Sequence, residues 1–244
     1  MSINQNLVEY YDELYPVVAD QTKFYREEMA AFGQPVKLLR VGCGTGSFEH
    51  QLAKEGADVT GIESMGELLE SANRKRRTQL MSLRFFQMAA DEMIRFLGKG
   101  FYNIISMLDS RIILLREPAR IHKLLADCKQ LLTDGGRLVL SLLNFDKYNV
   151  EPAIELPARK SIRSALYARI ATERDGSKLL DQSLETSTGR LVTVTSAVPV
   201  CPLTRDQLDV FAKDIGFKRC DYFADFARSP FDEQNSDRLV ALLR

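Results

Sequence analysis

Three glycines, Gly42, Gly44 and Gly46, stand at alternate positions directly after the apolar run 36–41, and Glu63 ends a second apolar stretch. Glycine lets a backbone turn sharply and lets a ligand lie against bare peptide. A carboxylate that follows such a loop by about twenty residues, on the neighbouring strand, can accept hydrogen bonds from the two hydroxyls of a ribose. The sequence therefore predicts a site for a nucleoside-containing cofactor.

Other loops rich in glycine fit these residues less well. The dinucleotide fingerprint has its third glycine one position later, where this chain has Ser47, which disfavours a nicotinamide dehydrogenase. A phosphate-binding P-loop requires Gly-Lys followed by Ser or Thr, and that sequence is absent after Gly46. A tight strand-to-helix turn in some other α/β protein is the remaining interpretation.

Strands and helices are predicted to alternate through the first two thirds of the chain. Apolar runs predict strands near 36–41, 58–63, 83–88, 101–107 and 136–143, and helical patterns cover 47–55, 65–77, 91–97 and 118–132. Residues 134–136 are expected to form a turn before the last of these strands. Such alternation predicts an α/β fold with a Rossmann-like, doubly wound and mostly parallel sheet.

The remaining segments are expected to complete one domain over residues 1–244. Residues 1–34 are predicted to form a helical lid interrupted around Tyr15, and 35–147 with 200–244 the cofactor-binding core. Between them, 148–199 begins with a polar connection rich in proline and continues as three alternating stretches, at 165–174, 179–187 and 190–198. This antiparallel insertion is expected either to wall a substrate pocket or to form a surface meander. A helix capped by Thr204 and ended by Gly216, then strands near 217–224 and 238–243, would close a seven-stranded sheet.

Composition limits the function classes. Lysine plus arginine equal aspartate plus glutamate at 33 each in 244 residues, so no global field favours nucleic acid or an anionic membrane. The basic run 74–77 suits the end of a helix, although a phosphate-binding patch is an alternative. Two histidines and four cysteines without Cys-x-x-Cys spacing disfavour a metal site and a Ser-His-Asp hydrolase. Without a signal peptide or an apolar run of membrane length, we expect a cytoplasmic enzyme.

Gly-Cys-Gly-Thr-Gly followed by a strand that ends in Glu63 resembles class I S-adenosylmethionine-dependent methyltransferases, and the resemblance covers nearly the whole chain. It is closest to the branch that contains glycine, sarcosine and aminosugar N-methyltransferases. The residues 144–146, Asn-Phe-Asp, resemble the Asn-Tyr-Asp of the glycine and sarcosine enzymes. The resemblance implies S-adenosyl-L-methionine as cofactor and a small-molecule acceptor. It gives no support to an RNA substrate.

The resemblance also implies roles for individual residues. The cofactor-binding residues would be Tyr11, Tyr25, Gly42, Cys43, Gly44, Glu63, Ser64, Met65, Ala90, Asp91 and Leu108. The lid tyrosines would close over the methionine end of the cofactor, where an aromatic face attracts a cation; alternatively they staple the lid to the core. Asp109 and Tyr11 would be the catalytic residues, with Asp109 meeting the acceptor amine or capping the following helix. Cys43 would pack in the loop rather than act as a nucleophile.

Two residues depart from the family pattern. Arg40 stands where the family usually has an acid that steadies the glycine loop and helps to bind the cofactor's ammonium group, and Ala89 replaces the expected adenine-binding aspartate. Asp91 lies two positions further on. These departures raise a second hypothesis, a degenerate methyltransferase fold that binds an altered nucleoside cofactor or acts through a protein partner. A carboxylated cofactor analogue, whose charge Arg40 could meet, is one form of it.

Methyl transfer from a sulfonium needs acceptor, methyl and sulfur held in line, and positioning of this kind contributes on the order of 7–11 kcal/mol. An amine that arrives unprotonated needs no strong base, so the shortage of histidine favours nitrogen over oxygen as the acceptor atom. For a hydroxyl acceptor, Asp109, Tyr11 or Tyr15 would have to accept the proton. An exposed face of the antiparallel insertion could pair two chains as a homodimer.

Overall fold

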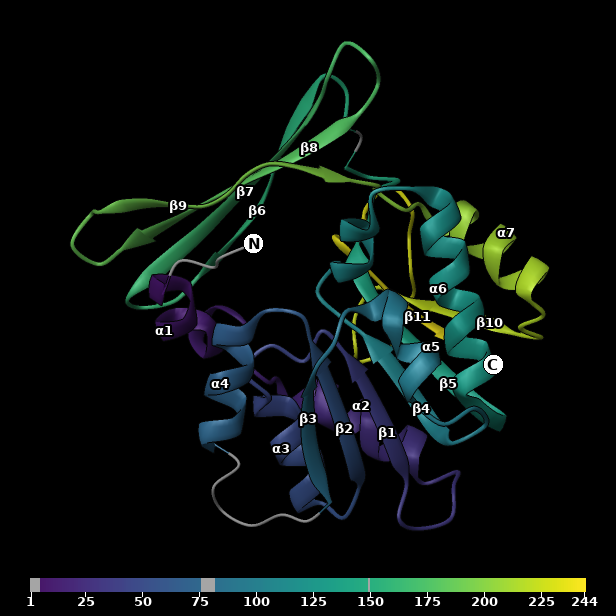
Figure 1. Cartoon of the computed structure of the whole chain (residues 1–244). Helices are drawn as coiled ribbons and strands as arrows, with labels where there is room; N and C mark the ends of the chain where they lie inside the picture. The colour runs from purple at the N-terminus through teal and green to yellow at the C-terminus, as the bar shows by residue number, and fades with distance from the viewer. Residues whose placement is uncertain (1–4, 76–81, 149) are drawn as a thin grey trace.

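A seven-stranded sheet forms the core of the computed structural model, which describes residues 5–75, 82–148 and 150–244 (Figure 1). Its order is β10-β11-β5-β4-β1-β2-β3, and β11 runs antiparallel to both of its neighbours. The strands are β1 Lys37–Val41, β2 Asp58–Glu63, β3 Leu83–Gln87, β4 Tyr102–Met107, β5 Leu132–Leu143, β10 Cys220–Phe223 and β11 Arg238–Leu243. The predicted Rossmann-like α/β fold is confirmed.

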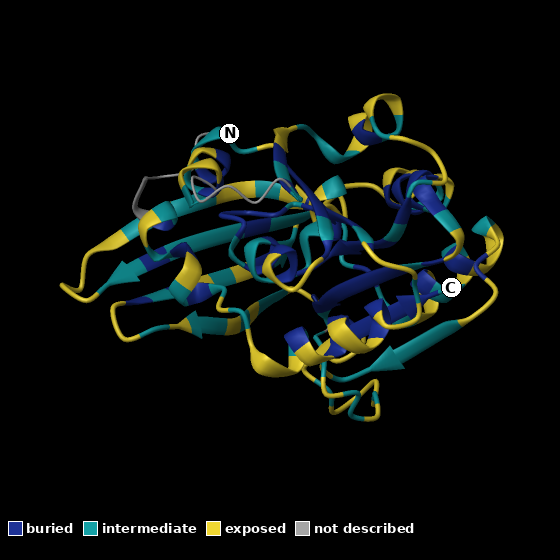
Figure 2. Cartoon of the chain, turned by 90° about the horizontal axis from the view of Figure 1, so that it is seen from below, coloured by how far each residue is buried: buried dark blue, intermediate teal, exposed yellow. Residues whose placement is uncertain are grey.

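Helices cover both faces of this sheet. They are α1 Gln5–Leu14, α2 Ala19–Met29, α3 Ser47–Lys54, α4 Gly66–Lys75, α5 Met93–Phe96, α6 Pro118–Leu131 and α7 Arg205–Ile215, with 3-10 turns η1 Ala90–Glu92 and η2 Arg111–Leu115. One apolar cluster joins the sheet to α6 and α7, and a second joins it to α2 and α3. Figure 2 shows the buried residues concentrated along the central strands. The core is therefore made by the two faces of the sheet.

The chain changes direction across the sheet between β1 and β4. From β1 it builds outward through β2 to β3, and then returns to place β4 on the other side of β1. Ligands of open α/β sheets bind beyond the carboxyl ends of the strands at such a switch point. The glycine loop after β1, Glu63 at the end of β2 and the loop after β4 all lie at this edge.

The insertion after β5 is a separate antiparallel sheet of four strands, which projects from the core in Figure 1. Its strands are β6 Ala153–Lys160, β7 Ser164–Thr172, β8 Lys178–Thr186 and β9 Leu191–Val200. The sequence predicted three strands, and β6 was expected to be a connection because Pro152 and Pro157 interrupt it. Pro157 lies where the pairing of β6 with β7 shifts register. Proline is tolerated at such an irregularity on an edge strand.

Other local expectations were met or altered. Residues 134–136 belong to β5, where they lie within a register shift against β4, instead of forming a separate turn. The helix predicted after Thr204 forms: Thr204 accepts a hydrogen bond from the Gln207 backbone, and Gly216 ends α7 at a φ of 91°. Of the basic run 74–77, the last two residues lie outside the described residues. Among the described helices, none has the length and apolar character to span a bilayer.

Candidate active site

The glycine loop is anchored to the neighbouring strand by its backbone. The amides of Gly42 and Cys43 both donate to the carbonyl oxygen of Ile62, at 2.9 and 3.0 Å. Gly42 and Gly44 have φ values of 73° and 59°, which side-chain-bearing residues rarely adopt. The loop therefore presents bare, rigid backbone at the end of β1.

Glu63 lies against this loop and is almost completely buried. One carboxylate oxygen accepts the Gly44 amide at 2.9 Å, and the other accepts the amides of Ser64 and Met65 at 3.0 and 3.2 Å. These backbone donors hold the carboxylate in one orientation. The sequence placed these four residues in the cofactor site, and the structure brings them together.

Two side chains cover the glycine loop. Arg111 of η2 donates from Nη1 to Glu63 Oε2 at 3.0 Å, and its Nη2 donates to the Tyr11 hydroxyl. A Cβ added at Gly42 would lie 2.6 Å from Arg111 Cδ, and one at Gly44 would lie 2.5 Å from the Tyr11 hydroxyl. The space above the bare backbone is thus filled by the movable ends of Arg111 and Tyr11.

Asp109 follows β4 in a strained stretch of backbone. Asp109 and Ser110 have φ values of 60° and 59°. The turn is held because Ser110 donates its amide to Ser141 and accepts the Leu143 amide on its hydroxyl, at 2.8 and 2.9 Å. Left-handed conformations at residues other than glycine cost energy and cluster at functional sites. This strain is consistent with a functional role for Asp109.

The Asp109 carboxylate contacts two guanidinium groups. Its Oδ1 accepts from Arg159 Nη2 at 2.7 Å, and Oδ2 lies 3.9 Å from Arg40 Nη2. Burial raises the pKa of Asp109, but Arg159, Arg40 and Arg111 together outweigh it, so the net pKa lies below its ordinary value. Asp109 is therefore an anion at neutral pH and a weak base.

Arg40 is neutralised inside the protein. Its Nε lies 3.1 Å from Glu49 Oε1 of α3, and both side chains are buried. Burial raises the pKa of Glu49, while the charge of Arg40 opposes the rise. Arg40 Nη1 is buried and has no hydrogen-bond partner among the described residues. The arginine at the usual acid position thus comes with a compensating acid nine residues later.

The lid tyrosines differ in their surroundings. Tyr11 stacks on Tyr15 with ring centroids 4.6 Å apart, and the Arg159 guanidinium lies 4.2 Å from the centre of the Tyr15 ring. Burial raises the pKa of both phenols above the ordinary value, so both stay protonated. Tyr25 is completely buried, packs edge-on against Phe48 and lines neither of the cavities described below. Its position is that of a core residue that fastens α2 to α3.

The other predicted cofactor residues are dispersed. Cys43 and Leu108 are buried and line a cavity on the Arg40 side, and burial raises the pKa of the Cys43 thiol. Ala90 opens η1, and Asp91 binds Arg120 at 2.8 Å with its side chain half exposed. Asp91 lines neither of the cavities, and its carboxylate is engaged by α6.

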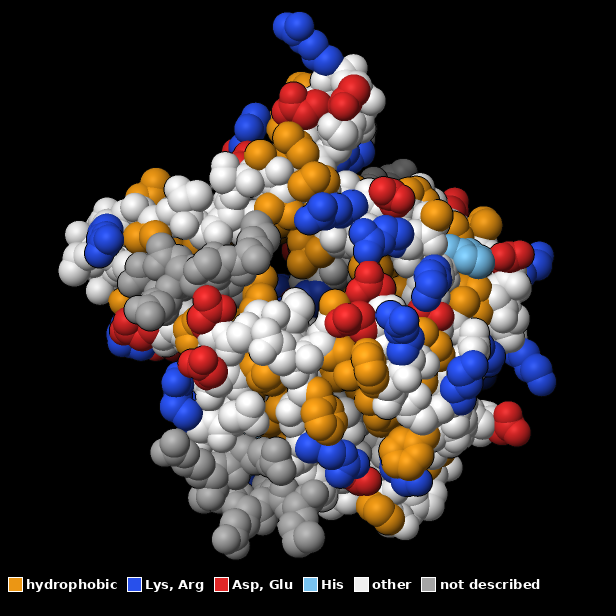
Figure 3. Space-filling model, in the orientation of Figure 1, with side chains coloured by type: hydrophobic (Ala, Val, Ile, Leu, Met, Phe, Trp, Pro, Cys, Tyr) orange, Lys and Arg blue, Asp and Glu red, His pale blue; other side chains and the backbone are white. Residues whose placement is uncertain are grey.

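A cavity of about 370 Å³ lies between the carboxyl edge of the core, α1 and the four-stranded sheet. Figure 3 shows the surface hollowed between that sheet and the core. Leucine is the commonest residue in its walls, which also contain Tyr11, Asp109, Arg111, Arg159 and Arg238. A second cavity on the Arg40 side shares Tyr11, Tyr15, Asp109, Arg159 and Arg238 with the first. Side chains of the insertion line the first cavity, and Asp109 lines both cavities.

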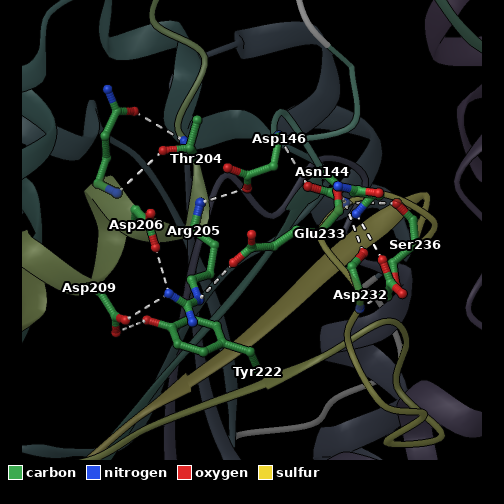
Figure 4. A network of polar contacts seen from close by, with 12 residues as sticks. Asn144, Asp146, Thr204, Arg205, Asp206, Asp209, Tyr222, Asp232, Glu233 and Ser236 are labelled. Carbon is green, nitrogen blue, oxygen red and sulfur yellow. Dashed lines mark hydrogen bonds and ion pairs between the residues drawn. The ribbon is translucent and has the colours of Figure 1, made fainter.

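The Asn-Phe-Asp segment fastens surrounding loops. Asn144 is completely buried; its amide nitrogen donates to the carbonyls of Glu233 and Ser236 at 2.8 and 2.9 Å (Figure 4). Asp146 accepts the Arg205 amide at the start of α7. These contacts hold the connection between β10 and β11, and so place the first residues of β11 at the cavity.

Three arginines of the site were not anticipated from the sequence. Arg111 lies two residues after Asp109, so its position could have drawn attention to it. Arg159 on β6 and Arg238 on β11 reach the site only through the packing of distant segments. Among the described residues, no three histidine, cysteine, aspartate or glutamate side chains are grouped to hold a metal.

These features define the fold and loop arrangement of class I S-adenosylmethionine-dependent methyltransferases, and the resemblance inferred from the sequence is confirmed. Residues 38–136 match the family described as a methyltransferase domain.

Known relatives agree with this assignment. The ubiquinone biosynthesis O-methyltransferase of Psychrobacter cryohalolentis is 32% identical over 129 residues, which cover 52% of this chain and 47% of that protein. The chain spans about half the length of the curated relatives that it matches.

Two solved structures share the fold over nearly their whole length. The CcbJ methyltransferase of Streptomyces caelestis has a TM-score of 0.80 and 18% identity, covering 98% of this chain and 95% of its own. The amino pentose methyltransferase CalS10 of Micromonospora echinaspora has a TM-score of 0.68 and 17% identity, covering 98% and 96%.

The residues at the glycine loop fit the nucleoside cofactor of this class. Gly42 and Gly44 form a cradle that a Cβ would fill, and the groups now in that space are side chains rather than backbone. Arg111 supplies Glu63 with a donor that a ribose hydroxyl could replace. Binding at this site therefore requires Arg111 and Tyr11 to move, while the backbone can stay where it is.

Proposed function

We propose that this chain is an S-adenosylmethionine-dependent methyltransferase that acts on a small-molecule acceptor, with nitrogen preferred over oxygen. The proposal rests on one observation: two spaces adjoin at the same edge of the sheet. The glycine cradle beside Glu63 and the cavity of about 370 Å³ share Tyr11 and Arg111 as their common wall. One space suits a nucleoside, and the other suits an acceptor.

Glu63, Gly42 and Gly44 would hold the nucleoside end of the cofactor, with Met65 beside the base. When bound, S-adenosylmethionine supplies a methyl group already activated by its sulfonium. The contribution of the protein is then to bind both partners, exclude water and keep them in line, which is worth about 7–11 kcal/mol in well-oriented reactions. The Tyr11–Tyr15 stack offers an aromatic wall of the kind that attracts cations.

The preference for nitrogen follows from the absence of a suitable base among the described groups at the cavity junction. Tyr11 and Tyr15 have raised pKa values, and the pKa of Asp109 is lowered. None of the three accepts a proton readily near neutral pH, whereas a hydroxyl acceptor needs one that does. A neutral amine can attack without one, and Asp109 can stabilise the positive charge that develops on its nitrogen.

The test is a methyl-transfer assay that follows formation of S-adenosylhomocysteine with matched pairs of small amines and alcohols. We expect turnover with amines and at most a trace with the paired alcohols. Glu63→Ala should lose turnover together with cofactor binding, and Arg190→Met in the distant β8–β9 turn should behave as the native chain. Turnover confined to the alcohols would contradict the nitrogen preference, and a folded chain without turnover or cofactor binding would contradict the function.

A second candidate function is binding of a different cofactor, an analogue of S-adenosylmethionine that carries an additional carboxylate. The buried, unpartnered Nη1 of Arg40 favours it, because an unpaired donor of this kind is costly unless a ligand satisfies it. Competitive titration of S-adenosylmethionine against a carboxylated analogue decides between them. Tighter binding of the analogue that disappears in Arg40→Met supports this candidate, and equal binding removes it.

A further inference from the structure

Arg238 is the first residue of β11, and its side chain lines both cavities of the site. It has no ion pair and no side-chain hydrogen bond with any of the described residues. Its backbone position is well fixed: Arg238 pairs with Leu143 of β5, and the carbonyl of the preceding residue, Asp237, accepts the Asn144 amide at 3.1 Å. The backbone of Arg238 is therefore fixed, and its unpaired guanidinium faces the space where the acceptor is expected.

The other arginines that line the two cavities each have an ion pair. Arg40 pairs with Glu49, Arg111 with Glu63, and Arg159 with Asp109. Asp237 is next to Arg238 in the chain, but its carboxylate is engaged by Lys147 Nζ at 2.7 Å and by the Tyr148 hydroxyl at 2.8 Å. Among the described arginines that line the cavities, Arg238 is therefore the one without an ion pair.

Arg238 is exposed, so its guanidinium is accessible to a ligand, although the groups around it partly desolvate the charge. Burial lowers the pKa of Arg238 and the nearby Arg159 lowers it further, while Asp109 and Asp237 act in the opposite direction. The cavity wall beside it is largely apolar, with Leu142, Leu156 and Leu180 among its side chains. Charge-assisted hydrogen bonds between a guanidinium and an oxyanion are among the strongest polar contacts in such surroundings.

We propose that Arg238 is a binding subsite for an oxyanion, either a carboxylate or a phosphate, on the acceptor whose amine meets Asp109. The inference rests on the proposed function, since it assigns the cavity to the methyl acceptor. It narrows the acceptor class to small molecules that carry both an amine and an anionic group, joined by an apolar part that contacts the leucine walls.

The experiment measures the binding of three ring compounds that differ in one group. Benzoate, phenyl phosphate and benzyl alcohol are titrated by ligand-detected nuclear magnetic resonance into the chain saturated with S-adenosylhomocysteine. We expect at least one anion to bind about tenfold or more tightly than benzyl alcohol, and the preferred anion identifies the source of the oxyanion. In Arg238→Met the preference should vanish while benzyl alcohol binds as before. Arg238→Lys, which keeps the charge, should retain part of it.

Arg190→Met, in the exposed turn between β8 and β9, is the matched control for loss of one arginine and should leave the preference intact. Thermal unfolding verifies that each variant is folded. Equal binding of anions and alcohol, no binding of either anion, or a preference that survives in Arg238→Met would overturn the inference. Titration of S-adenosylhomocysteine alone separates the two claims: its failure to bind refutes the proposed function, whereas its binding without an anion preference refutes only the subsite.

Discussion

Arg111 Nη1 lies 3.0 Å from Glu63 Oε2, so an arginine of the chain itself occupies the carboxylate expected to bind ribose. The Glu63 side chain is 1% exposed and that of Arg111 is 18% exposed, which makes this a largely buried ion pair. A ligand that binds Glu63 has to replace Arg111, and the free energy of that exchange reduces its apparent affinity.

Arg111→Ala should therefore bind S-adenosylhomocysteine more tightly than the native chain. We expect the dissociation constant to fall about tenfold, equivalent to about 1.4 kcal/mol, in isothermal titration. The ligand-free variant should also unfold at a lower temperature, because Glu63 loses its partner. Arg120→Ala, which breaks the half-exposed pair with Asp91, is the control and should change neither quantity much. Weaker binding by Arg111→Ala would mean that Arg111 contacts the cofactor instead of competing with it.

The low pKa of Asp109 predicts a simple pH profile for transfer to an amine. Because Asp109 stays ionised, kcat/KM between pH 5 and 9 should show one ascending limb set by the pKa of the acceptor. Asp109→Asn should lower the rate roughly 10²-fold without moving that limb. A second loss of kcat/KM as the pH falls, present in the native chain and absent from Asp109→Asn, would show that Asp109 acts as a base.

Asp109 should also contribute to stability in a defined pH range. Its folded pKa is depressed, so its contribution is present above its unfolded pKa and is lost as the pH falls below about 4, through the folded pKa. Urea unfolding at pH 3 and pH 6 should therefore differ less for Asp109→Asn than for the native chain. An unchanged difference would contradict the pairing of Asp109 with Arg159.

Glu49 is predicted to be indispensable only while Arg40 is present. Glu49→Gln leaves a buried guanidinium without its charge partner, and we expect a loss of about 3–5 kcal/mol in the free energy of unfolding. Arg40→Met combined with Glu49→Gln should recover most of that loss, as a double-mutant cycle in urea would measure. Arg40→Asp alone should be damaging, because it adds a carboxylate near Glu49 and Asp109. A double variant as unstable as Glu49→Gln would contradict the pairing.

The parts of the site that the sequence predicted are encoded by local patterns. The glycine loop and Glu63 follow strands whose apolar runs are unambiguous, and parallel neighbours bring their carboxyl ends to one edge. The resemblance to the methyltransferase family, applied to the loop after the fourth predicted strand, assigned Asp109 to the site. These residues could be found because their position depends only on the strand order.

The rest depends on packing that no local pattern records. Because of Pro152 and Pro157, the sequence did not predict β6 as a strand, and Arg159 lies on that strand. Arg238 reaches the cavity because Asn144 holds a distant connection. Arg40 is neutralised by Glu49 only because α3 packs against β1. The arginine therefore looked more disruptive in the sequence than it is in the structure.

The most direct test of the central claim is isothermal titration of S-adenosylhomocysteine into the native chain and into Gly44→Val. Gly189→Val is the control for backbone strain, because Gly189 also has a positive φ, of 75°, but lies in an open turn. We predict micromolar binding by the native chain and by Gly189→Val, and none by a folded Gly44→Val, whose side chain would fill the cradle. A folded native chain that does not bind, or a Gly44→Val variant that binds normally, would contradict the assignment of the glycine loop as the cofactor site.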